Sequence, residues 1–157
     1  MKITSFITGL IISIMFFITP ASAIEPLAGS FNPDEHPEIV EVLGDHEYAQ
    51  GVIDALQDAG TNWGELWNAV KLTEGLTWSY CCWLIINMPH LDRLEMTKDI
   101  LLEHVRYSHA TRSDLPYTAP QELFREYILT YRIGDEPVRP WRSEIWWTYK
   151  HLSLIHI

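Results

Sequence analysis

The spacing of apolar residues is the feature that most constrains the fold of this chain. The clearest case is an amphipathic helix over residues 91–112, with charged residues on one face. On its apolar face we place Leu94, Ile100, Leu101, Val105 and either Tyr107 or Ser108. No part of the chain carries a convincing strand pattern. The sequence therefore predicts an all-α fold class, a layer of about five to six helices.

Helical spacing also occurs upstream of this segment. Residues 38–60 have apolar residues near helical intervals, and Gly44 and Gly51 weaken this helix enough to allow a break in two. Its apolar residues are Val42, Tyr48, Val52, Ile53 and Leu56. In the next helix the residues that share a face are Trp63, Leu66, Trp67 and Val70. Asn62 and Glu65, at the start of that helix, have the spacing of a capping box.

An almost continuous apolar run covers residues 78–86. A buried helix and a buried strand both fit such a run, because periodicity does not separate them. Its length and its helical neighbours favour a helix. We expect this helix to end at Asn87-Met88-Pro89, because the residue before a proline is disfavoured in the helical conformation.

Two more helices are predicted near the end of the chain. Thr118 and Gln121 have capping-box spacing, and Pro120 suits a first turn, so one helix should begin there. The residues that it should bury are Leu123, Phe124, Tyr127 and Ile128. A loop over residues 132–140 follows, and residues 141–150 form the last helix.

Residues 1–23 differ from the rest of the chain. Lys2 precedes an apolar run, and Ala21-Ser22-Ala23 forms an A-x-A cleavage site. The run is shorter than the roughly 20 residues that a membrane-spanning helix needs. We therefore expect a signal peptide that is cleaved after Ala23, and a protein that is secreted or periplasmic. It would meet a membrane only through this peptide during export. An N-terminal linker over residues 24–37 follows.

The chain is acidic, with 21 Asp and Glu against 11 Lys and Arg and a formal net charge of −10. Nucleic acids and anionic membrane surfaces bind basic patches, so this charge argues against both as partners. Paired carboxylates such as Asp34-Glu35 and Asp135-Glu136 are interpreted as solubilising charge in loops.

Cys81 and Cys82 are adjacent, and they are the only cysteines. Their Cα atoms must lie about 3.8 Å apart, whereas disulfides prefer a Cα–Cα distance of about 5.5 Å. We therefore expect no disulfide between them that stabilises the fold. With His90, His104 or His109 as a base, either thiol would suggest a nucleophile. Burial in the apolar run would make a thiol inert, so we interpret both cysteines as packing residues.

The histidines do not have metal-site spacing. His104 and His109 are five residues apart and diverge by about 140° on a helix, whereas a pair at i and i+4 converges. His36 and His46 lie in or near the linker. We interpret these histidines as part of a solvated polar face. The sequence therefore indicates no metal ligand, no cofactor-binding residue and no catalytic residue.

Arg132, Glu136 and Arg142 bracket a Pro-rich loop beside Trp141. We expect a structural ion-pair cluster there. The alternative is that this loop lines a binding site.

Several short segments follow one another in a recognisable order. "LIINMP" with Asp92 is similar to F-L-I-x-N-M-P-x-x-D, and "LLEHVRYSHATR" is similar to L-L-x-E-N-V-x-x-A-x-x-A-R. "APQELFREYILTYRI" is similar to I-P-E-E-x-F-x-x-Y-V-L-P-Y-R, and "DEPVRPWR" to N-E-x-x-x-x-W-R. Upstream, "ALQDAGTNWGELWNAV" is similar to A-G-x-N-R-x-E-L. In this order, residues 55–142 resemble the helical region that precedes the catalytic core in bacterial transglutaminase-like proteins.

The chain departs from that pattern at three places. Thr130 stands where the family has Pro, His104 stands where it has Asn, and "DLPY" lacks the family's Trp. We interpret these as changes at helix surfaces and in turns.

The resemblance implies a papain-like α+β core beyond residue 142, with a Cys nucleophile on a helix and His and Asp on strands. No Cys or Asp follows Arg142, and Cys81 and Cys82 precede the helical motifs. We therefore expect residues 38–151 to form a non-catalytic helical module. The full-length parent would act on peptide amide bonds by a Cys-His-Asp mechanism.

The resemblance also implies partners. The module would dock on the missing core of the same protein through "TYR" and "DEPVRPWR", and the parent would take a peptide or protein substrate. The alternative is a self-contained, secreted helical module that binds another protein through a Trp-rich face.

The chain ends in "HLSLIHI", and no helix stop signal precedes this stretch. Residues 152–157 also match one reading frame of a transposon-end adapter used in sequencing libraries. We expect them to be a non-native, adapter-derived tail, and we expect the natural sequence to be truncated near His151.

Overall fold

The computed structural model describes residues 29–114, 119–132 and 134–153, and all the regular structure in these ranges is helical. The helices are α1 (Pro37–Leu43), α2 (Ala49–Asp58), the 3₁₀ helix η1 (Gly60–Asn62), α3 (Trp63–Lys71), α4 (Gly75–Asn87), α5 (His90–Glu95), α6 (Lys98–Asp114), α7 (Gln121–Tyr127) and α8 (Trp141–Ser153). The predicted all-α class is confirmed. Eight α-helices replace the expected five or six, because two predicted helices are each divided in two.

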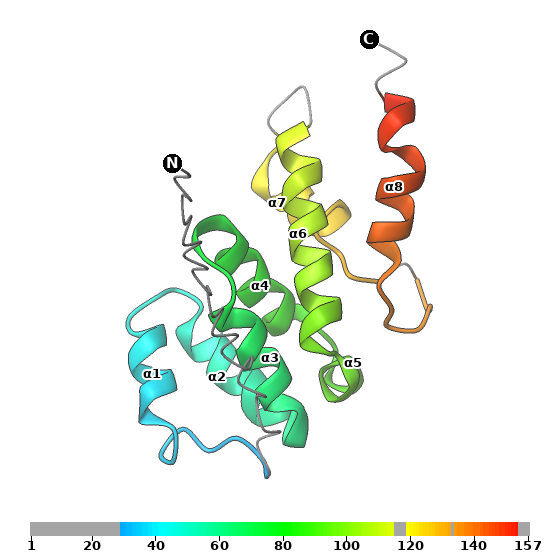
Figure 1. The fold of residues 1–157 in the computed structure, drawn as a ribbon. Helices are drawn as coiled ribbons and strands as arrows, with labels where there is room; N and C mark the ends of the chain where they lie inside the picture. The colour runs from blue at the N-terminus through cyan, green and yellow to red at the C-terminus, as the bar shows by residue number, and fades with distance from the viewer. Residues whose placement is uncertain (1–28, 115–118, 133, 154–157) are drawn as a thin grey trace, which may run out of the picture.

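Helix α6 lies near the centre of the arrangement in Figure 1. It packs against α3 and α4 on one side and against α8 on the other. Helix α2 packs on α3 and α4, and α1 packs on α2. Helix α8 therefore stands at one edge of the molecule, beside α6 (Figure 1).

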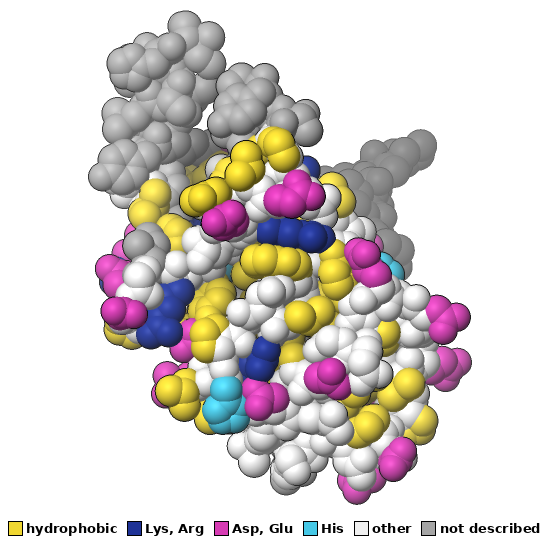
Figure 2. Space-filling model, turned by 180° about the vertical axis from the view of Figure 1, so that it is seen from behind, with side chains coloured by type: hydrophobic (Ala, Val, Ile, Leu, Met, Phe, Trp, Pro, Cys, Tyr) yellow, Lys and Arg dark blue, Asp and Glu magenta, His cyan; other side chains and the backbone are white. Residues whose placement is uncertain are grey.

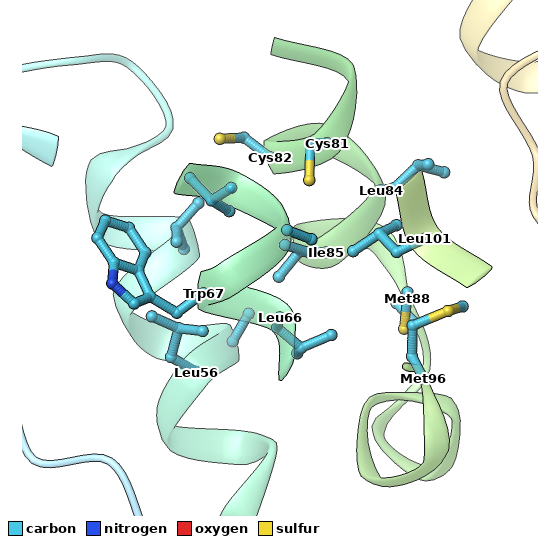
Figure 3. Packing of buried hydrophobic residues seen from close by; sticks show 14 of the residues in the cluster. Leu56, Leu66, Trp67, Cys81, Cys82, Leu84, Ile85, Met88, Met96 and Leu101 are labelled. Atoms are coloured by element: carbon cyan, nitrogen blue, oxygen red, sulfur yellow. The ribbon is translucent and has the colours of Figure 1, made fainter. Parts of the chain in front are cut away.

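One buried hydrophobic cluster joins α1 to α7. Figure 3 shows its centre, where Leu56 of α2, Leu66 of α3, Ile85 of α4 and Leu101 of α6 converge. Full burial of one such side chain stabilises the fold by about 1.5–3 kcal/mol. The face predicted for α3 is confirmed, because its four apolar residues are all buried: Trp63, Leu66, Trp67 and Val70. The apolar run at 78–86 is a helix, as predicted.

The single helix predicted over residues 91–112 is wrong, because α5 ends at Glu95 and α6 begins at Lys98. Met96, between them, has an extended backbone and is fully buried. The Asn62 side chain donates to the carbonyl oxygens of Arg93 (2.7 Å) and Met96 (2.9 Å). These bonds satisfy carbonyls at the end of α5, which would otherwise lack partners.

Glu65 completes the break between α5 and α6. Its carboxylate accepts a hydrogen bond from the backbone N–H of Lys98, at 2.7 Å. A carboxylate suits the N-terminus of a helix, where N–H groups are unpaired. The predicted capping box at the start of α3 is therefore wrong, because Asn62 and Glu65 serve α5 and α6 instead. Leu94, which we placed on the apolar face of the helix predicted over residues 91–112, is 41% exposed rather than buried.

The predicted break within residues 38–60 is at Gly44, which has a φ of 51° at the end of α1. Gly51 instead lies inside α2, where a Cβ atom would come within 2.9 Å of Ile86 Cδ1. Glycine at this position therefore allows α2 and α4 to approach closely. In α1 the buried residues are Ile39 and Leu43, whereas Val42 is 65% exposed, contrary to the expected face.

Helix α7 is shorter than predicted, and its buried face is smaller. Phe124 is fully buried, but Leu123 and Tyr127 are exposed at 50% and 69%. Leu129 and Tyr131, in the segment that follows α7, are buried instead. The predicted cap Thr118 lies outside the described residues, and the residue before α7 is Pro120.

Part of the predicted N-terminal linker packs on the helices. Phe31 is buried, its ring centroid lies 5.2 Å from that of Trp63, and Trp63 Nε1 donates to the carbonyl of Gly29 at 3.0 Å. The predicted signal peptide lies outside the described residues. So does the predicted tail, apart from Leu152 and Ser153, with which α8 ends. Within the described part, none of the helices has the length and apolarity to cross a bilayer.

Candidate functional site

Cys81 and Cys82 lie in the core, as predicted from the apolar run. Both side chains are fully buried, and in Figure 3 the two sulfur atoms point in different directions. Burial raises the pKa of Cys82 to about 12, and burial also raises the pKa of Cys81, with a smaller contribution from its neighbour. A buried thiol of this kind stays protonated and is a poor nucleophile. The structure therefore gives these cysteines a packing role.

The histidines are dispersed over the molecule. His90 pairs with Asp58 at 2.9 Å on the surface, His36 lies beside Trp63, and His46 lies edge-on to Trp78. His109 lies beside the ring of Tyr80. In the part of the chain that the structure describes, no three His, Cys, Asp or Glu side chains are grouped to hold a metal ion.

His104 does not belong to a solvated polar face, so that prediction is wrong for this residue. Its side chain has no solvent exposure, and Nε2 lies 3.1 Å from the carbonyl oxygen of Arg139. Because a carbonyl only accepts hydrogen bonds, the neutral ring carries its proton on Nε2. Its Nδ1 is buried and has no hydrogen-bond partner among the described residues. The hydrogen bond of His104 therefore holds the loop before α8 against the middle of α6.

Asp92 of α5 is the centre of a polar cluster, the Asp92 cluster, which also contains Tyr131 and Arg132. The Asp92 carboxylate is 6% exposed. It accepts a hydrogen bond from the Tyr131 hydroxyl at 2.5 Å, and Arg132 Nη1 donates to both of its oxygens at 2.9 Å. Burial, together with the neighbouring Asp92 carboxylate, raises the pKa of Tyr131. The cluster ties the segment after α7 to α5, across about 40 residues of chain.

Arg142 and Trp141, with His104, form a second cluster, the Arg142 cluster. Arg142 is 8% exposed, and Nη2 donates to the carbonyl oxygens of Ile128 and of Thr130, the latter at 2.5 Å. Its Cζ atom lies 4.5 Å from the Trp141 ring centroid. Trp141 Nε1 donates to the carbonyl of Tyr131 at 2.9 Å. These bonds satisfy carbonyls of the irregular segment that follows α7.

The electrostatics of the Arg142 cluster disfavour a second positive charge. Burial lowers the pKa of Arg142 to about 10, which still leaves it charged at neutral pH. Burial and the charge of Arg142 lower the pKa of His104 to about 4. The His104 and Trp141 rings lie 5.6 Å apart between centroids, so little water separates these groups. The cluster therefore holds one cation and a neutral imidazole.

The predicted ion-pair cluster of Arg132, Glu136 and Arg142 has different partners in the structure. Arg132 pairs with Asp92 and also donates from Nε to the backbone carbonyl of Glu136 at 2.5 Å, whereas the Glu136 carboxylate pairs with Arg139 at 3.1 Å. Arg142 makes its hydrogen bonds to backbone carbonyls. The prediction was wrong because it considered only charged residues that are near one another in the sequence. Asp92 is distant in the sequence and lies beside this loop only in the folded chain.

The segments that carry the family resemblance meet at these two clusters. Asp92 follows "LIINMP", His104 lies in "LLEHVRYSHATR", Tyr131 and Arg132 end "ILTYR", and Arg142 ends "DEPVRPWR". The sequence indicated each motif but not the contacts between them. The one local signal was an Arg beside a Trp in a Pro-rich loop.

The surface near these clusters exposes large apolar side chains. They are Leu91 and Leu94 of α5, Leu123 and Tyr127 of α7, and Ile145 and Trp147 of α8, with Trp147 68% exposed. Figure 2 shows a face on which hydrophobic side chains lie between scattered acidic and basic ones.

Comparisons with protein-family models, with curated proteins and with solved structures find no match for this chain.

Proposed function

We propose that this chain is the non-catalytic helical module of a secreted or periplasmic transglutaminase-like protein. In this proposal the segment from Ile128 to Arg142, together with α8, supports a papain-like catalytic core that belongs to the same protein. The observation that carries the proposal is the convergence of the family-like segments at the Asp92 and Arg142 clusters.

The contacts of these clusters support a structural role for the motifs. Asp92 pairs with Arg132 from a segment 40 residues away, and Arg142 binds the carbonyl of Thr130. These two contacts join the segments around Asp92, Thr130 and Arg142 to one another. Here their contacts fix the direction in which the chain leaves the helical layer and enters α8, which is where a following domain would attach.

Exposed apolar side chains on α8 support docking on a core. Helix α8 packs against α6, while Ile145 and Trp147 remain exposed at 44% and 68%. Exposed Trp is enriched at interfaces, because its ring offers a large apolar area together with an N–H donor. The occupant that we propose is the catalytic core, because it would follow α8 directly in the chain.

The chemistry in this proposal belongs to the core. A papain-like core would supply a Cys nucleophile, a His base and an Asp that orients the His, and it would attack peptide amide carbonyls. Cys81 and Cys82 are unsuited to that role because burial raises the pKa of each thiol. The part of the chain described here would position the core rather than react.

The nucleotide sequence of the source DNA beyond codon 151 tests the proposal. We expect the natural reading frame to continue into a helix with a Cys and then into strands with His and Asp. A natural stop codon after codon 157 would contradict the proposal, and the self-contained interaction module would then be the better interpretation. Codons for residues 152–157 that differ from the adapter sequence would contradict only the adapter origin of the tail.

A second test uses the extended natural protein. Trp147→Glu should leave the unfolding midpoint of the 157-residue chain unchanged, because Trp147 is 68% exposed there. In the extended protein it should lower that midpoint, because it would place a charge in the docking interface. Val42→Glu is the matched control, since Val42 is 65% exposed on α1, a helix that contributes to neither cluster. An equal effect of the two substitutions in the extended protein would count against docking through α8.

A further inference from the structure

A pocket lies between α4 and α7, and it is distinct from the two clusters described above except at its rim. Its volume is about 250 Å³. The residues that line it are Trp83, Leu84, Asn87, Arg125, Glu126, Thr130 and Tyr131. Pockets for drug-sized ligands usually measure about 300–1,000 Å³, so this one suits a smaller molecule.

Arg125 is the positive group of this pocket, and it is partly buried. Its Cζ atom lies 5.9 Å from the ring centroid of Tyr48 and 6.0 Å from that of Trp83. Nη2 donates to the Tyr48 hydroxyl. The guanidinium therefore lies near two aromatic rings, and the hydrogen bond to Tyr48 orients it.

Arg125 has no carboxylate partner among the described residues, although the chain has 21 Asp and Glu. Its Nε is buried and makes no hydrogen bond within the described part of the chain. A partly desolvated cation with unused donors binds a carboxylate more strongly than a solvated one does, because less water must be displaced. The apolar walls formed by Trp83 and Leu84 would contact the body of such a ligand.

We propose that this pocket binds a small carboxylate with an apolar body, about the size of one N-acylated amino acid. The carboxylate would pair with Arg125, and the apolar body would lie against Trp83 and Leu84. Asn87 lies on the lining, and its Oδ1 can accept a hydrogen bond from an acyl amide while its Nδ2 donates to the Trp83 carbonyl. The binding requires no catalytic core.

Glu126 also lines the pocket and provides a test of the ligand's charge. Its side chain is exposed, and its hydrogen bond with the Tyr127 hydroxyl raises the pKa of that tyrosine. Its negative charge would repel an anionic ligand at the rim and attract a cationic one. Removing that charge therefore has opposite effects on the two ligand classes.

Isothermal titration calorimetry on the whole chain at low salt is the measurement, with N-acetylphenylalanine as the carboxylate probe and N-acetylphenylalaninamide as its uncharged match. We expect saturable binding of the carboxylate with a Kd of about 1 mM or tighter, which is what a ligand of about 15 non-hydrogen atoms ordinarily reaches. The amide should bind at least about tenfold more weakly. No binding of the carboxylate up to 10 mM, or equal binding of the two probes, would overturn the proposal.

Two variants with a matched control locate the binding. Arg125→Gln should weaken carboxylate binding at least about tenfold, and Glu126→Gln should strengthen it about threefold. Because Glu126 is exposed, Glu126→Gln should fold, and it tests the assignment even if Arg125→Gln fails to fold. Arg106→Gln, on the exposed surface of α6, makes the same charge change away from the pocket and should leave the Kd unchanged. Weaker binding in Glu126→Gln, or an equal loss in Arg106→Gln, would contradict the assignment.

A peptide probe separates the two sources of such a carboxylate. If acetyl-Gly-Gly-Phe with a free C-terminus binds as well as N-acetylphenylalanine, the pocket accepts peptide C-termini. If only the small probe binds, the ligand is a free small carboxylate. Binding of the same peptide as its C-terminal amide with equal affinity would refute carboxylate recognition.

Discussion

The buried imidazole of His104 should make the stability of this protein depend on pH between 4 and 6.5. In the folded state the pKa of His104 is lowered to about 4, because the ring is buried and the charged Arg142 is near. In the unfolded chain it returns to 6.5. As the pH falls below 6.5, the unfolded chain therefore takes up a proton before the folded chain does. The free energy of unfolding must decrease over this range.

The magnitude follows from these two pKa values. Between pH 7 and pH 5 the free energy of unfolding should decrease by about 2 kcal/mol on account of His104 alone. The decrease should approach about 3 kcal/mol once the pH falls below 4. Asp58 and Glu38, whose pKa values are lowered by hydrogen bonds, lose their contributions only below their ordinary values of 3.8 and 4.5. The contribution of His104 is obtained as the difference between the wild type and a variant that lacks this imidazole, because the chain has seven histidines.

Urea unfolding at pH 7 and at pH 5, followed by Trp fluorescence, measures this effect. His104→Gln removes the titrating group and keeps an amide N–H that can donate to the Arg139 carbonyl. Between pH 7 and pH 5, the free energy of unfolding of the variant should decrease by about 2 kcal/mol less than that of the wild type. His46→Gln is the matched control for the exchange itself, because His46 is exposed. Equal losses in the wild type and in His104→Gln would refute the reasoning.

Three further outcomes are expected. Asp92→Asn should lower the free energy of unfolding by about 2–3 kcal/mol in urea titrations, because it leaves the Arg132 guanidinium without its counter-charge, and an effect below 0.5 kcal/mol would count against the Asp92 cluster. Glu65→Ala should cost about 1 kcal/mol in the same assay, because the N–H at the start of α6 loses its acceptor; a neutral result would mean that water replaces the carboxylate without loss. The thiols of Cys81 and Cys82 should react with a disulfide reagent at pH 8 only as fast as the chain unfolds, and rapid reaction in native buffer would contradict their burial.

Where each helix lies could be predicted from the sequence, but several of its ends could not. The run from Trp78 to Ile86 forms most of α4, as its length and its helical neighbours favoured over a buried strand. The end of α5 and the start of α6 depend on hydrogen bonds from Asn62 and Glu65, about 30 residues upstream. The same two side chains satisfy a local capping rule, so sequence spacing alone gave the wrong partners.

The candidate site was only partly visible in the sequence. The motifs around Asp92, Tyr131 and Arg142 could be found by their order along the chain. Which charges pair could not be predicted, because Arg132 has nearer acidic neighbours than Asp92 in sequence. The burial of His104 was missed for a related reason, since the loop that covers it comes 35 residues later.

By itself, the sequence determined the helical class and most of the apolar residues that form the core. These follow from periodicity and hydrophobicity, which act between residues that are close along the chain. Only the tertiary structure decided the helix breaks, the partners of Asp92 and Arg142, and the position of Arg125 beside Tyr48 without a carboxylate partner among the described residues. Those features depend on which polar groups come together when distant segments pack. Burying a polar group without a hydrogen-bond partner costs free energy, so the fold keeps the contacts that give each buried polar group a partner.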